Sequence, residues 1–182
     1  MAKLISKIYG DALFETALDT GKVDGLFEEA AFVNRIFDEN PDLLKLLHHP
    51  NIIKEEKLKV MESVFEGNVS SEMTGFLRVV IEKDRESELP AILNWFIDRV
   101  KEYKHIGKAS VTSASELSAD QKKQIEKRLL ETTEYESIEM TFSVDESLIG
   151  GLMIRIGDRV VDSSIKTKLY EMKRELMKIQ LA

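Results

Sequence analysis

The spacing of apolar residues changes partway along the chain, and this change is what most constrains the fold. Through the first hundred residues apolar side chains recur every three or four positions, as at Ala30, Val33 and Phe37, which predicts amphipathic helices. From Ile138 to Val144 they alternate with polar residues, which predicts a half-buried strand. The sequence therefore predicts a helical half followed by a half that contains strands.

Turn-forming residues divide the helical half into six amphipathic stretches. Gly21 is placed to end the first helix as a left-handed cap, Pro41 opens the third, and Gly67 separates the fourth from the fifth. The sixth stretch ends before Gly107. Six helices with short connections predict an all-α bundle over residues 1–105.

Residues 106–182 are predicted to form a small mixed α/β domain in the order strand, helix, strand, strand, helix, so that the whole chain is α+β. The stretch 108–114 is rich in Val, Ser and Thr, which favours a strand. Ser118 and Gln121 have the spacing of a capping box, which predicts the start of the following helix. The boundary between the two domains is expected near residues 105–107.

The last helix has an apolar stripe whose spacing of four, three, four and three is that of a heptad seam. Its members are Ile165, Leu169, Met172, Leu176 and Ile179. Most such stripes pack on their own domain, and this one would then lie on the sheet. The alternative is that the stripe accepts a partner helix, because the predicted core of this domain is thin.

Composition and charge exclude several classes of function. The 182 residues include no cysteine, so the chain has no disulfide framework, no thiolate metal site and no cysteine nucleophile. The formal net charge of −7 disfavours nucleic acid as a partner. No apolar run approaches the roughly 20 residues needed to span a bilayer, so direct membrane insertion is not expected.

The residues that could carry catalysis do not form a recognisable constellation. His48 and His49 are adjacent and point about 100° apart on a helix, unlike the i, i+4 histidine pair of a zinc helix. His105 has no histidine or cysteine near it in the sequence. The glycine-rich stretch that begins at Gly150 lacks both the dinucleotide fingerprint and the lysine of a phosphate loop. We therefore predict no catalytic residue, no metal site and no cofactor.

The segment from Ile138 to Leu169 resembles the signature of the ATP synthase delta subunit family, the bacterial counterpart of the mitochondrial oligomycin-sensitivity-conferring protein. It combines the alternating strand, an acidic residue at Asp145, a glycine pair and an apolar-x-apolar-basic run. The signature residues in this last part are Gly150, Gly151, Leu152, Ile154 and Arg155.

Other parts of the chain agree with this resemblance, which covers nearly its whole length. The stretch 9–14 is similar to the family's opening helix, and the stretch 40–57 is similar to its NP-x-L…HP-x-I segment. The chief departure is at residues 83–85, where many relatives have a glycine or a second basic residue before the arginine. This departure affects one local contact.

The resemblance implies a non-catalytic stator subunit of the rotary ATP synthase. In that family the helical domain binds N-terminal helices of the alpha subunits on the catalytic head, and the C-terminal domain holds the b subunits of the peripheral stalk. Residues 1–105 would then bind the head and residues 106–182 the stalk. The head would not rotate with the rotor, and proton flow would stay coupled to ATP synthesis. The chain would lie at the cytoplasmic face of the plasma (inner) membrane, as a peripheral part of the enzyme.

The resemblance also implies where the partners bind. An alpha-subunit helix would occupy a groove between the first and fifth helices, lined by residues from a set of which some must face the core: Tyr9, Ala12, Leu13, Met73, Phe76, Leu77 and Val80. If the last helix is a partner surface, the stalk would contact Leu169, Met172, Leu176 and Ile179.

Two other classes of function stay open from the residues alone. A generic adaptor would bind diverse amphipathic helices, and a small hydrolase would require a polar constellation that we do not find in the sequence. A pull-down from membranes distinguishes them, because only a stator subunit is expected to be recovered with alpha and b subunits.

Overall fold

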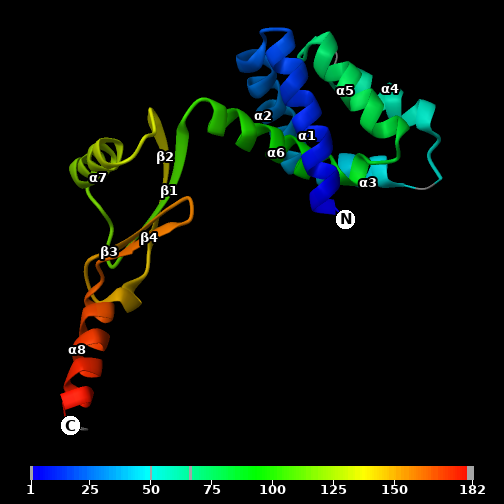
Figure 1. Cartoon of the computed structure of the whole chain (residues 1–182). Helices are drawn as coiled ribbons and strands as arrows, with labels where there is room; N and C mark the ends of the chain where they lie inside the picture. The colour runs from blue at the N-terminus through cyan, green and yellow to red at the C-terminus, as the bar shows by residue number, and fades with distance from the viewer. Residues whose placement is uncertain (1, 50, 66, 180–182) are drawn as a thin grey trace. The chain divides into compact units, whose positions relative to one another are not determined.

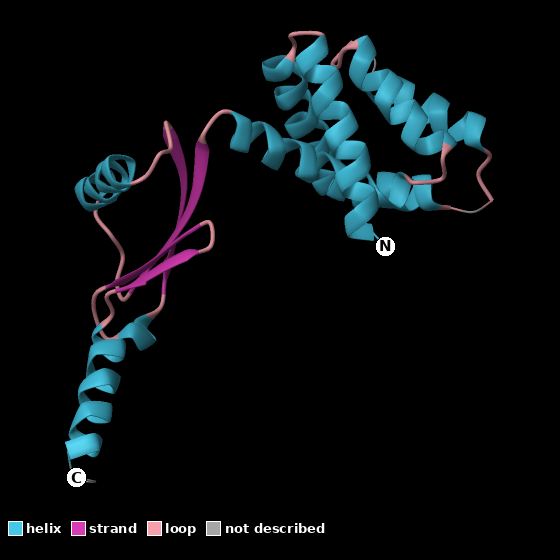
Figure 2. Cartoon of the chain, viewed as in Figure 1, coloured by secondary structure: helices cyan, strands magenta, loops and turns pink. Residues whose placement is uncertain are grey.

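The computed structural model describes residues 2–49, 51–65 and 67–179, and the side chains of these residues except 2, 3, 178 and 179. The chain divides into two compact units, Met1–Lys101 and Glu102–Ala182. The first unit is helical and the second combines strands with helices (Figure 2). The α+β fold class predicted from the sequence is therefore confirmed. The structural division lies after residue 101, whereas the sequence placed the boundary after residue 105.

Within the described residues, six α-helices and one short 3₁₀ helix form the helical unit (Figure 1). They are α1 Ala2–Asp19, α2 Val23–Glu39, α3 Pro41–His48, α4 Lys54–Phe65, α5 Ser71–Glu82, η1 Glu86–Glu88 and α6 Leu89–Tyr103. The helix ends predicted at Gly21 and Pro41 are observed. Gly21 has a φ of +66° directly after α1, and Pro41 is the first residue of α3.

One apolar core holds the helical unit together. The stripe predicted on α2 is buried, and Phe37 from this stripe contacts Phe65 of α4 edge-on, with ring centroids 6.0 Å apart. Phe96 of α6 is also fully buried in this core. Because helices from the beginning and the end of the unit share one core, the six helices form a single bundle.

The opening helix α1 approaches α6 closely at a glycine. A Cβ atom on Gly10 would lie 2.5 Å from Cδ1 of Trp95, so a larger residue there would displace the indole ring. The indole N–H of Trp95 donates a hydrogen bond of 2.9 Å to Asp11 Oδ1. The Gly10-Asp11 pair in the family-like opening stretch thus positions α1 against the last helix of the bundle.

A buried ion pair joins α4 to η1. Lys57 Nζ donates a hydrogen bond to Glu86 Oε1, and the two side chains are only 8% and 10% exposed. Glu86 Oε2 is also buried and has no hydrogen-bond partner among the described residues. Two residues before Glu86, Asp84 has a φ of +53° and pairs with Lys54, which is the local contact in the stretch that departs from the family pattern.

The second unit is built on a four-stranded sheet in the order β2-β1-β3-β4 (Figure 1). In chain order its elements are β1 Ile106–Ser113, α7 Ala119–Thr132, β2 Ser137–Val144, η2 Glu146–Leu148, β3 Leu152–Ile156, β4 Arg159–Asp162 and α8 Ile165–Ile179. β1 and β2 are parallel and are connected through α7, whereas β3 is antiparallel to both β1 and β4.

The predicted order of this unit was one strand short. The additional strand is β4, which returns along β3 after a turn at Gly157, whose φ is +54°. All four residues of β4 are exposed, so this strand has no alternation between buried and exposed positions that a sequence pattern could reveal. The capping box predicted at Ser118 is confirmed, with Gln121 as its second member.

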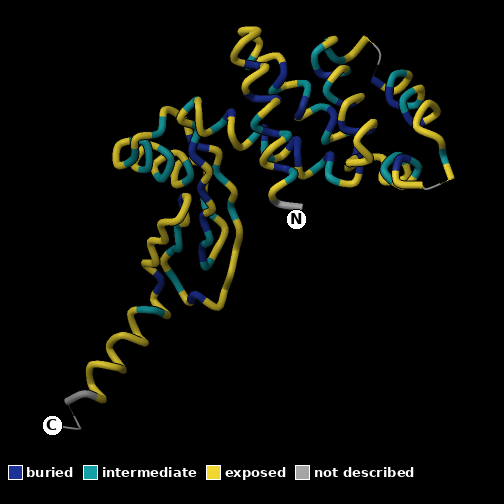
Figure 3. Tube along the Cα trace, turned by 45° about the vertical axis from the view of Figure 1, so that its right-hand side comes forward, coloured by how far each residue is buried: buried dark blue, intermediate teal, exposed yellow. Residues whose placement is uncertain are grey.

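The core of the second unit is small. Ala109, Ile138 and Ile156 form a buried cluster against which side chains from α7 pack, and Val111 and Leu148 are also buried. α7 itself has no buried residue. Most of this unit is therefore exposed or only partly buried (Figure 3). Among the described residues, no helix is both long and apolar enough to cross a membrane.

Replacing Lys57 with Ala is expected to destabilise the helical unit by about 3–5 kcal/mol, because the Glu86 carboxylate would stay buried without its partner. The exposed pair of Lys45 and Asp42 is a matched control, and Lys45→Ala should cost less than about 1 kcal/mol. Urea denaturation followed by the fluorescence of Trp95, the single tryptophan, measures both. Equal losses in the two variants would contradict this account of the buried pair.

Candidate partner-binding sites

An apolar groove of about 350 Å³ lies between α1 and α5. Ile8 of α1 and Val79 of α5 are 57% and 45% exposed, so apolar side chains on both walls of the groove face solvent. Two small residues, Ala12 and Gly75, widen it. The full lining is Ile8, Tyr9, Ala12, Leu13, Thr16, Glu72, Gly75, Phe76 and Val79.

The residues that the resemblance placed in this groove divide into two sets. Tyr9, Ala12, Leu13 and Phe76 line it, with Leu13 buried beneath the surface. Met73, Leu77 and Val80 lie in the bundle core instead, so their assignment to the groove is wrong. A helix repeats every 3.6 residues, so these three positions of α5 share a face that differs from the face of positions 72, 76 and 79.

Several groove residues were missed from the sequence. They are Ile8, Thr16, Glu72, Gly75 and Val79. The signal that could have found them is a second stripe on each helix, at steps of four on α1 and of three to four on α5. A polar residue in each of these stripes hides the pattern from a search for apolar residues alone.

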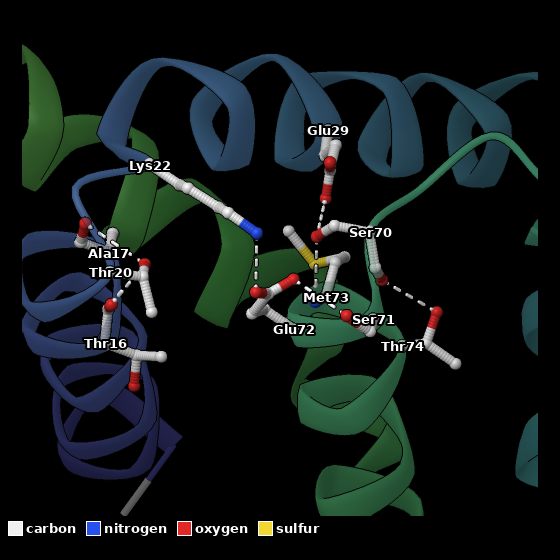
Figure 4. Close-up of polar contacts among 10 residues, drawn as sticks. All are labelled: Thr16, Ala17, Thr20, Lys22, Glu29, Ser70, Ser71, Glu72, Met73 and Thr74. Carbon is white, nitrogen blue, oxygen red and sulfur yellow. Dashed lines mark hydrogen bonds and ion pairs between the residues drawn. The ribbon is translucent and has the colours of Figure 1, made fainter.

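A network of polar contacts fixes the N-terminal end of α5, where Glu72 borders the groove (Figure 4). Ser70 caps the helix by accepting a hydrogen bond of 3.3 Å from the backbone N–H of Met73, and its own hydroxyl donates to Glu29 of α2 at 2.8 Å. Lys22, in the connection between α1 and α2, forms an ion pair with Glu72 at 2.7 Å. The end of the groove is thereby tied to the α1–α2 connection.

The Lys22 ammonium favours the ionised form of Glu72. Its hydrogen bond is the largest cause that lowers the pKa of the Glu72 carboxyl to about 2, and the backbone N–H of Glu72 and the hydroxyl of Ser71 lower it further. The carboxylate of Glu72 is therefore ionised at neutral pH, where the ion pair with Lys22 is fully formed.

A second hollow of about 610 Å³ lies between α4 and α5, and the sequence did not predict it. Leu58, Met61 and Phe65 of α4 form its apolar side, and the ion pair between Arg78 and Glu62 stands at its edge. Gly75 lines both this hollow and the α1–α5 groove.

In the second unit, the glycine pair of the signature allows a close backbone approach. Gly151 has a φ of +78°, and a Cβ atom there would lie 2.4 Å from the carbonyl oxygen of Ser163. A Cβ on Gly150 would meet only the end of the Ile165 side chain, 2.6 Å from its Cδ1. The pair therefore makes room for the segment that leads into α8.

The other signature residues lie in the neighbouring strand. Leu152 pairs with Ser113, and Ile154 lies between Val111 and Val161 in the sheet. Arg155 is exposed. We assign these residues a structural role, because they hold β3 between its two neighbours.

The base of α8 is held by its first residues and by backbone contacts. Ser164 is buried and caps the helix by accepting a hydrogen bond from Thr167 N–H, and the backbone N–H of Ile165 donates to Gly150 O at 3.0 Å. Asp162 accepts hydrogen bonds from the Thr167 hydroxyl and from Ser164 N–H, and these two contacts lower the pKa of its carboxyl. Asp162 and Ser164 together fix the first turn of the last helix.

Beyond its base, α8 is exposed over its described length (Figure 3). We call Ile165, Leu169, Met172, Leu176 and Ile179 the α8 seam. Leu169, Met172 and Leu176 are 52%, 61% and 65% exposed, so the expectation that the seam packs on its own sheet is wrong. The side chain of Ile179 lies outside the described residues. The seam does not pack on the sheet because α7 already covers the apolar face of this sheet through Leu129 and Leu130.

No cluster for metal chemistry is found in the part of the chain that the structure describes, where groups of three or more potential ligands (His, Cys, Asp or Glu) do not occur. His48, His49 and His105 are exposed, and His105 lies in the other unit from the adjacent pair His48 and His49. Among the described residues, none of these surfaces arranges groups for covalent chemistry.

Comparison with known proteins gives a consistent result over the whole chain. Residues 5–176 match the family model for the ATP synthase delta (OSCP) subunit. The ATP synthase subunit delta of Lachnoclostridium phytofermentans is 51% identical over 181 residues, which cover 100% of both chains. That of Brevibacillus brevis is 34% identical and covers 93% of this chain and 96% of its own.

A solved structure supports the fold. A chain in the cryo-EM structure of the Toxoplasma gondii mitochondrial ATP synthase hexamer superposes with a TM-score of 0.72 over 94% of this chain and 97% of its own. Its sequence is 18% identical, so this likeness concerns the fold alone.

Acidification should weaken the Lys22–Glu72 contact. Because the pKa of Glu72 in the folded chain, about 2, lies below its ordinary value of 4.5, the contact contributes stability above pH 4.5 and loses it as the pH falls toward 2. Glu72→Gln should abolish this part of the pH dependence, whereas Lys22→Met should reduce it, because the backbone N–H of Glu72 and the Ser71 hydroxyl remain. Denaturation midpoints across this pH range measure the effect. A double variant that loses more than either single variant would contradict the pairing.

Gly151→Ala should destabilise the second unit by about 1–3 kcal/mol, because the added Cβ meets backbone and the φ of +78° disfavours a side chain. Gly150→Ala is the matched control and should cost less, because the end of the Ile165 side chain can move. Hydrogen exchange of the β3 amides reports the stability of this unit. A larger loss in the Gly150 variant would show that the close approach at Gly151 is not the constraint.

Proposed function

The chain belongs to the ATP synthase delta (OSCP) subunit family, and we propose that its two units bind different parts of that enzyme. It is a non-catalytic stator subunit that links the catalytic head to the peripheral stalk. In our proposal the helical unit binds the N-terminal helices of the alpha subunits, and the second unit binds the b subunits of the stalk.

The α1–α5 groove is the observation that carries the proposal for the head. An amphipathic helix binds such a groove with side chains at steps of three and four residues, and a few buried anchors supply most of the affinity. Ala12 and Gly75 leave room for the backbone of an incoming helix, and Ile8 and Val79 offer apolar contacts on either side. Because Leu13 and Met73 beneath them are fixed in the core, the groove exists before the partner arrives.

The exposed α8 seam supports the second half of the proposal. A helix whose apolar side chains face solvent has area available for a partner, and α8 is fixed only at its base within the described residues. With one binding surface on each unit, the chain can hold the head against the stalk, so that the head does not turn with the rotor.

The proposed location follows from the proposed partners. As a part of the ATP synthase the chain is associated with a membrane-bound complex, and we propose that it lies at the cytoplasmic face of the plasma membrane. It would be held there through its partners, as a peripheral subunit.

Val79→Asp should weaken binding of a synthetic alpha-subunit N-terminal peptide to the full chain by about tenfold or more, because a carboxylate would have to be desolvated in the apolar groove. The matched control is Val64→Asp on α4, where an exposed valine lies outside the groove. Isothermal titration calorimetry measures both affinities. If both variants bind like the unmodified chain, the groove is not the site for the head.

A pull-down from membranes with the tagged full chain tests the whole proposal. Recovery of alpha and b subunits together is the expected result. The Val79→Asp chain should still recover b subunits, because α8 is unchanged. Recovery of neither subunit by the unmodified chain would contradict the stator assignment.

A further inference from the structure

The α8 seam is flanked by lysines on both sides. With a heptad numbering in which Leu169 and Leu176 are a positions, Lys166 and Lys173 occupy e positions and Lys168 occupies a g position. These are the positions that lie beside the core of a coiled coil and contact the charges of a partner helix. The other g position is Glu175. The seam therefore presents a narrow apolar stripe with a basic edge at the e positions and a mixed edge at the g positions.

The charge of α8 is opposite to that of the whole chain. The helix contains five basic and two acidic residues, whereas the formal net charge of the chain is −7. Lys168 and Lys173 are exposed, and neither forms an ion pair with a carboxylate among the described residues. Lys166 donates a hydrogen bond of 3.3 Å to the Ser147 hydroxyl and is exposed as well. Positive charge is thus collected along a helix that this chain leaves without a partner.

We propose that the α8 seam binds one acidic amphipathic helix of about two heptads. The fifteen residues of α8 are about 22 Å long, which sets the length of the partner segment. Its apolar side chains would pack between Leu169, Met172 and Leu176, and its carboxylates would face the flanking lysines. The inference rests on the proposed function, because it states the chemistry of the stalk segment that binds this unit.

A second copy of the chain suits the surface less well. Two α8 seams packed antiparallel would bring the e-position lysines Lys166 and Lys173 of both copies together, and like charges beside the seam oppose pairing. The charge pattern therefore favours a partner of opposite sign over self-association.

An anionic membrane surface also suits the seam less well. Helices that lie in a membrane interface bury a broad apolar face, whereas the seam is a narrow stripe of a and d positions bordered directly by three lysines and Glu175. Tyr170 and Met177, which are also exposed, lie beyond Lys166 and Lys173 and not in the stripe.

Charge reversal in the full chain tests the inference. The variant Lys166→Glu, Lys168→Glu, Lys173→Glu should bind the soluble part of the b subunits at least about tenfold more weakly than the unmodified chain. The matched control is Lys123→Glu, Arg159→Glu, Arg174→Glu, which changes the net charge equally at exposed positions outside the seam and should bind normally. Affinity of the unmodified chain should fall as salt is added, because the charge pairs are exposed. Circular dichroism checks that both variants are folded.

A designed peptide separates this inference from the proposed function. A two-heptad peptide with leucines at the core positions and glutamates beside them should bind the full chain, and the same peptide with lysines beside the core should not. If b subunits bind but neither charge reversal nor salt affects them, the inference is overturned while the proposed function stands. If b subunits do not bind, the proposed function fails. Binding of the acidic peptide then tests separately whether the seam accepts an acidic helix.

Three further results would overturn the inference. They are equal binding of the acidic and basic peptides, dimerisation of the full chain that is lost when Leu169 is changed to Asp, and binding of the unmodified chain to phosphatidylglycerol vesicles in place of the acidic peptide. Sedimentation of the chain alone and with vesicles measures the last two.

Discussion

Burial of one apolar stripe from each helix in a common core is the interaction on which the helical unit depends. Because that core is completed by residues such as Leu13, Met73 and Leu77, the unit does not need the second apolar faces of α1 and α5 for its own stability. Those faces stay at the surface and form the groove. A preformed groove suits a joint under load, because little binding energy is lost in ordering it when the partner helix arrives.

The second unit is organised differently. With few buried apolar residues, the described part of this unit relies on the hydrogen-bond ladders of four strands and on α7 packed over one face. Many of its exposed apolar side chains are on α8, outside the core. The two units thus divide one task, since each presents an apolar surface that its own fold does not use.

Much of the fold could be predicted from the sequence, because a helix with one apolar stripe and a clear end signal has few alternatives. Gly21, Pro41 and Ser118 mark ends that the structure confirms. The site was harder to predict. α5 is apolar on two faces, and a sequence does not show which face meets the core. The α8 seam has the same spacing whether its partner lies within the chain or outside it, so only the structure could reveal its exposure.

The joint between α8 and the sheet is made largely by main-chain atoms. Ile165 N–H binds Gly150 O, Ser163 N–H binds Leu152 O, and Gly151 lies against the carbonyl of Ser163. Every amino acid except proline offers the same main-chain donor and acceptor. The outward residues of α8 can therefore diverge between lineages together with the surface they contact, while the glycine pair keeps the attachment itself unchanged. Recognition and attachment can evolve separately in this small unit.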